Sequence, residues 1–347
     1  MKMKQLFNII LNATALAIVA GLIANAVLSV VFKYLGNLFL PDFFQMLSRS
    51  MYLMQFAIPV LVGISIGNQL KLNTMQTMVI GIAVLGGSGS LTFDSELGKW
   101  TAIPMGDLFN VIFAAFISTI FVMYLGDKFG SLTTILLPMF GAGIPICISL
   151  YTLPYAKSIT KYLADILFHF TTLHPQIMCV LIAISFSLLI VSPVSTVAMG
   201  IILFTNTNQL GAGAAALGVL SAAYVLAIGS IKAKNPKGVT YAIILGAIKL
   251  MMPNCARTPL LMIPIFLTAA VTGFSGYIFN ILGTQESAGF GIIGLLGPVK
   301  ALELNVPFIN VILSFFIIPI ISAFIFDKIC QDYLKLYTKD AYISNNY

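Results

Sequence analysis

Charged residues are scarce in this chain: Lys, Arg, Asp and Glu make up 8% of its 347 residues, against about 25% in ordinary soluble domains. No polar region approaches the ~50 residues that a small soluble domain needs. A soluble catalytic or nucleic-acid-binding module is therefore excluded. The net charge of +7 does not indicate nucleic acid as a partner, because the basic residues are scattered over the ends of apolar segments, where they meet lipid headgroups.

Residues for metal, redox or hydrolytic chemistry are also few, with two histidines and four cysteines in the whole chain. His169 and His174 are five residues apart, a spacing that does not place two metal ligands on one helical face. The cysteines show no paired spacing, and phosphate-loop, dinucleotide and serine-hydrolase fingerprints are absent. We expect no metal site, no cofactor and no intramembrane hydrolase, so the sequence does not predict an enzyme.

Long apolar runs make up most of the chain, of which 59% is hydrophobic. A spanning helix needs about 20 mainly apolar residues. We predict an all-α polytopic membrane protein with about ten spans, placed roughly at 7–32, 50–69, 75–93, 107–126, 131–153, 175–193, 211–231, 238–252, 259–282 and 306–329. The first run is too long for the apolar region of a signal peptide, which predicts a retained first helix.

Two apolar stretches, 193–210 and 283–302, fit poorly as ordinary spans. Each is short, marked by glycine or proline and polar at one end, which predicts re-entrant hairpins. Between the halves, 155–174 carries apolar residues at helical spacing with charges on another face, which predicts an amphipathic connector helix. The predicted organisation is an N-terminal five-span half (1–153), the connector (154–174), a C-terminal half (175–330) and a cytoplasmic tail (331–347).

Orientation follows from lysines near both ends of the chain. By the positive-inside rule they predict cytoplasmic termini, and the residues concerned are Lys2, Lys4, Lys328, Lys335 and Lys339. Counting spans then places the basic loop 232–237 outside, against the rule. Either one hairpin crosses completely or this loop belongs to a crevice.

The loop Gly283–Gly291 is the first candidate site, because it places a carboxylate between long apolar segments. An acid at membrane depth is costly unless it meets water, a partner or a ligand. Glu286 can accept paired hydrogen bonds from vicinal hydroxyls, and Thr284, Gln285 and Ser287 add neutral partners. The alternative is a hydrated surface loop between two spans.

A second candidate lies where Pro253 and Pro259 bracket Asn254 and Arg257. The prolines predict a broken helix with free carbonyls. Lys249 and Arg257 could bind an anionic group or pair with the acid of the loop, or they are snorkelling cations at helix ends.

The segment 193–210 supplies a third set of polar groups. Asn206 and Asn208 suit polyol recognition, although a polar turn at the membrane surface explains them equally well.

These segments, above all Lys249–Asn254 (KLMMPN) and the 283–291 loop, make the chain resemble the EIIC membrane component of the bacterial phosphotransferase system. The fold implied is that of the glucose superfamily. More narrowly, the chain is similar to a stand-alone EIIC-like branch that includes the perfringolysin O regulator family. The resemblance covers nearly the whole chain: five spans, an amphipathic connector, then five spans with two hairpins.

The resemblance implies a homodimer formed by the N-terminal halves, in the bacterial cytoplasmic membrane. Each C-terminal half would hold one solute between its hairpins and exchange it by an elevator-type movement. Glu286 matches the second-hairpin glutamate that contacts the sugar in sugar-transporting relatives. The implied partners are a small polar solute, a sugar or related polyhydroxy compound, and membrane lipids.

The sequence departs from the sugar-transporting pattern in two ways. Those relatives often carry a histidine in the first hairpin, and no histidine follows His174 here. No IIA or IIB domain is fused to the chain, and Cys330 lacks a surrounding soluble fold that could make it a phosphocysteine. Group translocation would therefore need separate IIA and IIB proteins. We expect an EIIC-like transporter, or alternatively a transporter-derived membrane sensor that binds solute without translocating it.

Overall fold

The computed structural model of the chain describes residues 3–23, 28, 31–32, 35–94, 98–126, 128–204, 208–291 and 295–344. For residues 22, 23 and 286 it describes the backbone and not the side chain. The chain divides into two compact units. Leu35–Thr160 together with the N-terminal helix form the first, and Lys161–Tyr347 belong to the second.

Helices dominate both units, as the sequence predicts. Within the described ranges, seven helical stretches are long and apolar enough to cross a membrane: Met3–Gly21, Pro41–Gln69, Leu108–Leu125, Gly130–Thr171, Gln209–Lys232, Pro259–Ile278 and Phe308–Tyr333. Two further apolar helices, Thr74–Gly87 and Pro175–Ile190, are shorter. The multi-pass helical character is confirmed, whereas the count of ten spans and the re-entrant course of the hairpins stay predictions.

The first unit consists of helices, short 3₁₀ or π turns (η) and one strand pair. In chain order these are α1 (Met3–Ile18), η1 (Val19–Ile23), α3 (Pro41–Leu53), η2 (Met54–Ala57), α4 (Ile58–Gln69), α5 (Thr74–Gly87), β1 (Leu91–Asp94), β2 (Lys99–Ala102), α6 (Leu108–Leu125), η3 (Gly130–Leu132), α7 (Thr133–Pro138), η4 (Met139–Gly143) and α8 (Ile144–Thr171). Residues of α8 after Thr160 belong to the second unit.

A buried amide joins three helices of this unit. Asn110, on α6, donates to the carbonyl of Gly87 at the end of α5 and to that of Ser149 on α8. The side chain is 1% exposed, so these bonds satisfy a polar group that would be costly among apolar helices. Nearby, Asp107 caps α6 by accepting from the Asn110 backbone N–H at 3.0 Å.

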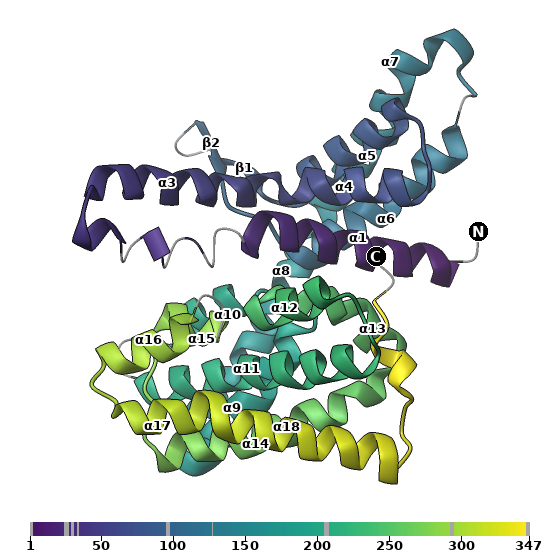
Figure 1. The fold of residues 1–347 in the computed structure, drawn as a ribbon. Helices are drawn as coiled ribbons and strands as arrows, with labels where there is room; N and C mark the ends of the chain where they lie inside the picture. The colour runs from purple at the N-terminus through teal and green to yellow at the C-terminus, as the bar shows by residue number, and fades with distance from the viewer. Residues whose placement is uncertain are drawn as a thin grey trace. The chain divides into compact units, whose positions relative to one another are not determined.

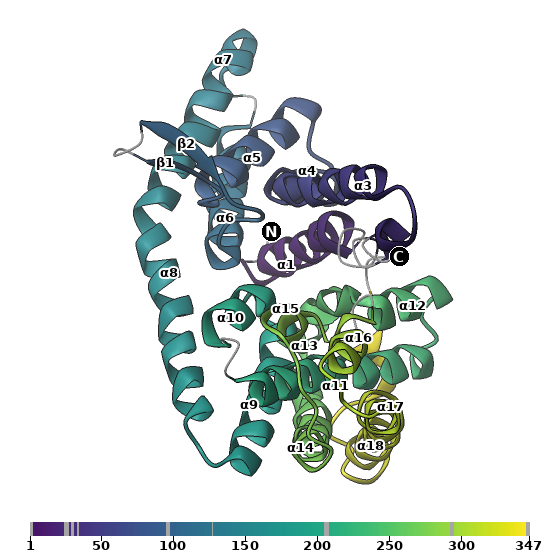
Figure 2. The ribbon, with the colours of Figure 1, turned by 90° about the vertical axis from the view of Figure 1, so that its left-hand side faces the viewer.

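Three features of the first unit differ from the sequence predictions. Helix α5 ends at Gly87, before the predicted end of that span at 93, and residues 91–102 form an antiparallel hairpin (β1 and β2, Figure 2). The chain is mostly helical, as predicted, but the sequence did not predict this strand pair. Helix α8 also continues through Pro154 to Thr171, so the predicted fifth span and the predicted connector lie in one continuous helix. A proline inside a helix removes one backbone bond and kinks the helix without necessarily ending it.

The second unit is a cluster of helices of very unequal length. In chain order these are α9 (Pro175–Ile190), α10 (Thr196–Leu203), α11 (Gln209–Lys232), α12 (Lys237–Leu245), η5 (Ala247–Met251), α13 (Met252–Arg257), η6 (Pro259–Leu261), α14 (Met262–Ile278), α15 (Gln285–Phe290), α16 (Leu296–Glu303), α17 (Phe308–Ile312), η8 (Leu313–Ile317), α18 (Ile318–Lys328), η9 (Ile329–Tyr333) and η10 (Lys339–Tyr342).

Helix α11 is the core of the second unit and packs against α9, α14, α15 and α18 (Figure 1). In an apolar stretch of 18 residues within this helix, 89% of the residues are buried. Its sequence, QLGAGAAALGVLSAAYVLAIGSIK, is rich in Gly, Ala and Ser. Small side chains let neighbouring helices approach closely, which is how membrane helices gain packing energy without a hydrophobic driving force. This explains why one helix can be surrounded on so many sides.

The predicted span 238–252 is wrong as a single helix. It divides into α12, η5 and α13, with the first break at Gly246. Gly246 has φ +123°, a conformation that residues with a Cβ rarely adopt. The glycine therefore ends α12 and turns the chain, and the break that the sequence predicts at Pro253 begins seven residues earlier.

Candidate functional site

The two segments predicted as hairpins contribute α10 and α15, which pack side by side in the second unit (Figure 2). Helix α10 has eight residues, about 12 Å at 1.5 Å per residue, so it cannot cross a bilayer of ~30 Å. Segments separated by about 90 positions in the sequence thus meet at one place.

This contact brings two backbones unusually close together. The Thr196 hydroxyl donates to the Gly289 carbonyl at 2.7 Å. A Cβ on Gly289 would lie 2.4 Å from Val197 Cα, and one on Gly200 would lie 2.7 Å from the Gln285 carbonyl oxygen. Any larger residue at either glycine would push the helices apart. The glycines of the 283–291 loop therefore serve helix contact.

The start of α15 is held by its own side chains. Thr284 and Ser287 form a capping box: the Thr284 hydroxyl accepts from the Ser287 N–H, and the Ser287 hydroxyl accepts from the Thr284 N–H at 2.7 Å. These two predicted solute contacts are thus used in shaping the turn. Gln285 is half-buried. Glu286 is the second residue of α15, and its side chain lies outside the described structure.

Asn208, another predicted contact, caps α11. Its Oδ1 accepts from the Gly211 N–H at 2.9 Å, and the neighbouring Gln209 carbonyl accepts from the Gly283 N–H at 2.8 Å. The start of α11 is therefore tied to the loop that precedes α15. Asn206 lies outside the described residues.

Lys249 connects the broken helix to the start of the first predicted hairpin. It is 6% exposed, and its ammonium donates to the carbonyls of Ser192 and Val194 at 2.5 and 2.9 Å. These carbonyls lie just after α9, where a side-chain N–H donor satisfies backbone acceptors that have no helical partner. Lys249 thus fixes the chain between α9 and α10. Arg257 is exposed at the end of α13.

Asn254 has a different environment from the one predicted. Its amide nitrogen donates to the carbonyls of Ala341 and Ile343, both at 2.8 Å. Asn235 donates to the Tyr342 carbonyl at 2.8 Å and accepts from the Ser344 N–H at 3.0 Å. The hydrogen bonds of Asn254 in the described chain thus go to the C-terminal segment and not to Thr284, Gln285 or Ser287, and both asparagines hold that segment.

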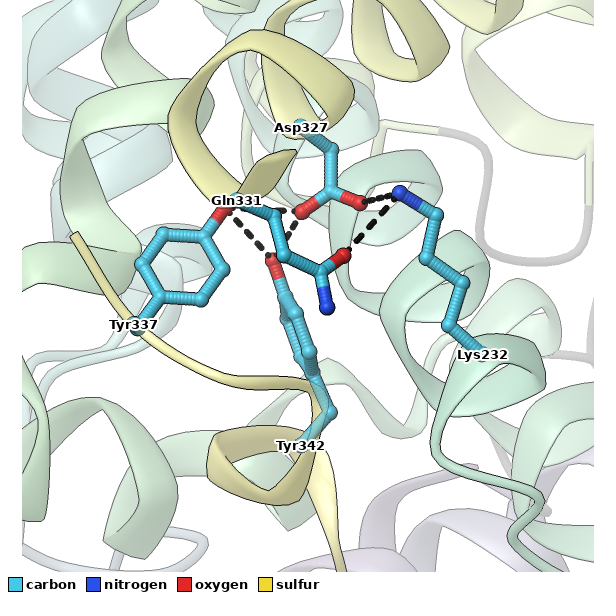
Figure 3. A network of polar contacts seen from close by, with 5 residues as sticks. All are labelled: Lys232, Asp327, Gln331, Tyr337 and Tyr342. Atoms are coloured by element: carbon cyan, nitrogen blue, oxygen red, sulfur yellow. Dashed lines mark hydrogen bonds and ion pairs between the residues drawn. The ribbon is translucent and has the colours of Figure 1, made fainter. Parts of the chain in front are cut away.

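The same segment completes a buried polar cluster that we call the Asp327 cluster: Lys232, Asp327, Gln331, Tyr337 and Tyr342 (Figure 3). The Asp327 carboxylate is 0% exposed and pairs with Lys232 at 2.5 Å. Its other oxygen accepts from the hydroxyls of Tyr337 at 2.8 Å and Tyr342 at 2.5 Å. Lys232 also donates to Gln331 at 3.2 Å. A buried carboxylate with one cation and two hydroxyl donors is well satisfied.

Tyr342 fits this cluster because α11 makes room for it. The side chain is 0% exposed, and a Cβ on Gly229 would lie 2.3 Å from its ring. Burial first, and then the Asp327 carboxylate, raise the pKa of the Tyr342 hydroxyl. Tyr342 is therefore a neutral donor at all physiological pH values.

The family comparison matches residues 9–344 to the family described as "Phosphotransferase system, EIIC". The chain belongs to this family. The resemblance predicted from the sequence is therefore confirmed across both units. A search of curated proteins and one of solved structures returned no significant match. As an EIIC protein, the chain is a multi-pass membrane protein of transporter type.

In this EIIC protein, sequence reasoning singled out the two segments that form the α10–α15 contact and missed the Asp327 cluster. A signal was present: Asp327 and Lys232 are charges at the ends of strongly apolar runs, and such charges pair with one another more often than chance. Nothing in the sequence, however, indicates that Tyr342, fifteen residues after Asp327, returns to the same place.

Proposed function

We propose that this EIIC protein is a transporter whose second unit binds a small polar solute, a sugar or related polyhydroxy compound, beside the contact between α10 and α15. Glu286 is the central acceptor, and Gln285 is its neutral neighbour. Thr284 and Ser287 shape the turn that presents both, and Lys249 positions the chain before α10. Asn206 remains a further candidate contact, whereas Asn208 and Asn254 belong to the scaffold.

The observation that carries this proposal is the bond between Thr196 and Gly289. It supports a site formed jointly by two discontinuous segments, because short helices with irregular backbone at their ends are the usual way to build a binding site within a membrane. A carboxylate accepts paired hydrogen bonds from adjacent hydroxyls, and an amide side chain both donates and accepts. This chemistry favours a polyol over an apolar solute.

The transport mechanism proposed is an elevator-type alternating access within a homodimer, in the bacterial cytoplasmic membrane with both termini in the cytoplasm. The first unit would form the dimer interface and the second would carry the solute. Where the solute is phosphorylated on entry, separate IIA and IIB proteins supply the phosphoryl group.

A binding screen on the purified protein tests the solute class. Sugars, sugar acids and small carboxylates are compared for thermal stabilisation, because a ligand at 100 times its Kd stabilises by about 2.7 kcal/mol. We expect stabilisation by a neutral sugar or polyol. Stabilisation by carboxylates alone would contradict a carboxylate acceptor, because two like charges would face one another.

The variant Glu286→Gln tests the residue. Losing a charge-assisted bond costs about 1.5–3 kcal/mol, roughly 10- to 100-fold in Kd. The matched control is Glu303→Gln, which removes an exposed carboxylate of α16 that pairs with Lys300. It should leave Kd unchanged. Equal affinity in both variants would overturn the assignment.

A second candidate is a transporter-derived sensor that binds solute without moving it. It is favoured by the absence of histidine after His174 and by the use of Thr284 and Ser287 in a cap. Solute flux into reconstituted vesicles distinguishes the two functions, since a sensor binds solute and produces no flux.

A further inference from the structure

The hairpin β1–β2 of the first unit has two chemically different faces. Residues directly opposite in an antiparallel pair share one face, and the register pairs Leu91 with Ala102 and Phe93 with Trp100. The apolar face therefore carries these four residues. The opposite face carries Thr92 and Thr101, whose hydroxyls are 2.8 Å apart.

The apolar face is open in the first unit. Trp100 is 71% exposed and Phe93 is 56% exposed, and their rings meet edge to face with centroids 5.4 Å apart. A two-stranded hairpin is marginal in water unless its apolar face packs against something. Large exposed aromatic side chains on such a hairpin therefore indicate an interaction surface.

The base of the hairpin is fixed to the start of α6. The Ile103 N–H donates to the Ser90 carbonyl at 2.8 Å, and the Asp107 N–H donates to the Ser88 carbonyl at 2.9 Å. Ser88 and Ser90 are 0% and 1% exposed, so the base is part of the packed unit. The hairpin cannot move far from the helix end.

Helix α6 places this base at the edge of the hydrocarbon layer. Its 18 residues span about 27 Å, close to the ~30 Å of a hydrocarbon core, so both of its ends must lie near a boundary. The other end bears the side chains expected there: Tyr124 is 71% exposed, and the Lys128 ammonium lies 3.5 Å from its ring centroid. Phe93 and Trp100 are each two residues from Leu91 and Ala102, the pair with which the strands begin at this base. Two residues cover about 7 Å along a strand, which is comparable to the depth of one headgroup layer.

We propose that the apolar face of β1–β2 docks into the phospholipid headgroup region of the membrane that the chain crosses. Trp and Phe rings supply apolar area, and the indole N–H finds acceptors at the level of the headgroups. The threonine face stays in water. The partner is the lipid surface itself, and the inference does not depend on the proposed solute.

Trp100 is the only tryptophan in the chain, so its fluorescence reports this face directly. The full-length protein is placed in phosphatidylcholine nanodiscs and excited at the red edge of the indole band, where tyrosine does not absorb. Bromine is carried on the acyl chain either close to the headgroup or at the chain end, and iodide serves as the aqueous quencher. We expect the strongest quenching from bromine close to the headgroup.

Every other pattern overturns the proposal. Quenching by iodide alone would mean a solvated face. Quenching by neither agent would mean that a second copy or another part of the protein covers it. Stronger quenching from the chain end would mean deep insertion.

A matched control moves the indole to the opposite face of the same strand, with Trp100→Phe and Thr101→Trp combined. This variant should be quenched by iodide and weakly by either bromolipid, provided that it elutes as a monodisperse species. A separate variant, Phe93→Ser, retains Trp100 and should shift its quenching from lipid towards iodide. If Phe93→Ser leaves the lipid quenching of Trp100 unchanged, the apolar face is not the docking surface.

Discussion

The contact between α10 and α15 and the Asp327 cluster belong to the same unit but hold the chain together by different means. In the described residues of α10 and α15, the contact consists of backbone packed closely at Gly200 and Gly289, and of one side-chain hydrogen bond, from Thr196 to Gly289. The second saturates a buried carboxylate with Lys232, Tyr337 and Tyr342. Polar networks that are fully satisfied rigidify a structure, whereas contacts with few specific bonds open at lower cost.

The difference assigns separate roles to the two regions. Under the proposed function, the site takes up and releases a solute and needs a contact that can open, and the α10–α15 contact has few specific bonds to break. The Asp327 cluster and the asparagines that bind residues 341–344 fix the C-terminal segment on α11, α13 and α18. Substitutions in the Asp327 cluster should therefore lower the stability of the fold, and substitutions at the α10–α15 contact should alter solute exchange.

The largest effect is expected from Asp327→Asn. The substitution leaves Lys232 and two tyrosine hydroxyls around an uncharged group, and breaking a buried ion pair costs about 3 kcal/mol or more. Thermal unfolding of the purified protein should show a marked loss of stability. Asp332→Asn, which alters an exposed acid in the next turn, is the control. An equal effect of both variants would contradict the role of the pair.

A smaller effect is expected from Gly289→Ala. The added Cβ meets Val197 at 2.4 Å, and overpacking of this kind costs about 1–3 kcal/mol. Because the strain falls on the α10–α15 contact, solute affinity should fall together with stability. In the control Gly238→Ala the new Cβ meets open space, so neither quantity should fall. Unchanged solute affinity in Gly289→Ala would show that the α10–α15 contact is not part of the solute site.

Tyr342→Phe should destabilise by about 1.5 kcal/mol, the cost of losing a hydrogen bond to a charged acceptor. The ring stays packed against Gly229, and Tyr337 and Lys232 still satisfy Asp327. Tyr333→Phe, at a 74% exposed position, should have no effect on unfolding. Loss of solute binding in Tyr342→Phe, with the fold intact, would show that the cluster takes part in the site.

The smallest effect concerns pH. The raised pKa of Tyr342 means that its contribution to stability is complete below the unfolded tyrosine pKa of about 10. It declines as pH rises above that value, because the unfolded state releases the proton and the folded state does not. Tyr342→Phe should therefore lose less stability than the wild type between pH 10 and 11. Parallel curves would contradict the burial of this hydroxyl next to Asp327.

Periodicity and composition predicted much of the fold. The apolar runs 107–126 and 211–231 correspond closely to α6 and α11, because a membrane fixes the length and polarity of a spanning helix. The same reasoning failed where local chemistry overrides length. Gly246 divides an apolar run, Pro154 does not interrupt α8, and Thr92 and Thr101 belong to a strand pair inside a predicted all-helical chain.

The candidate site was predicted in part for a related reason. A carboxylate and glycines in an apolar context identify a special segment, and the structure pairs that segment with α10. The bonds of Asn254 could not be read from the sequence, because the carbonyls that accept them lie 87 and 89 residues further along the chain. The caps formed by Thr284 and Asn208 are local, each to a residue three positions on, and the sequence analysis assigned these side chains to the solute instead. Polar residues that look available in a sequence are often used by caps and by distant loops.

The division of roles between the two regions is tested most directly by solute-induced stabilisation in three proteins: wild type, Glu286→Gln and Tyr342→Phe. We expect the same increase in unfolding temperature for wild type and Tyr342→Phe at saturating solute, although the second starts from a lower value. We expect an increase of half or less for Glu286→Gln at the same concentration, because its Kd is roughly 10- to 100-fold higher. A full increase in Glu286→Gln, or its loss in Tyr342→Phe alone, would show that the solute site and the Asp327 cluster do not have these separate roles.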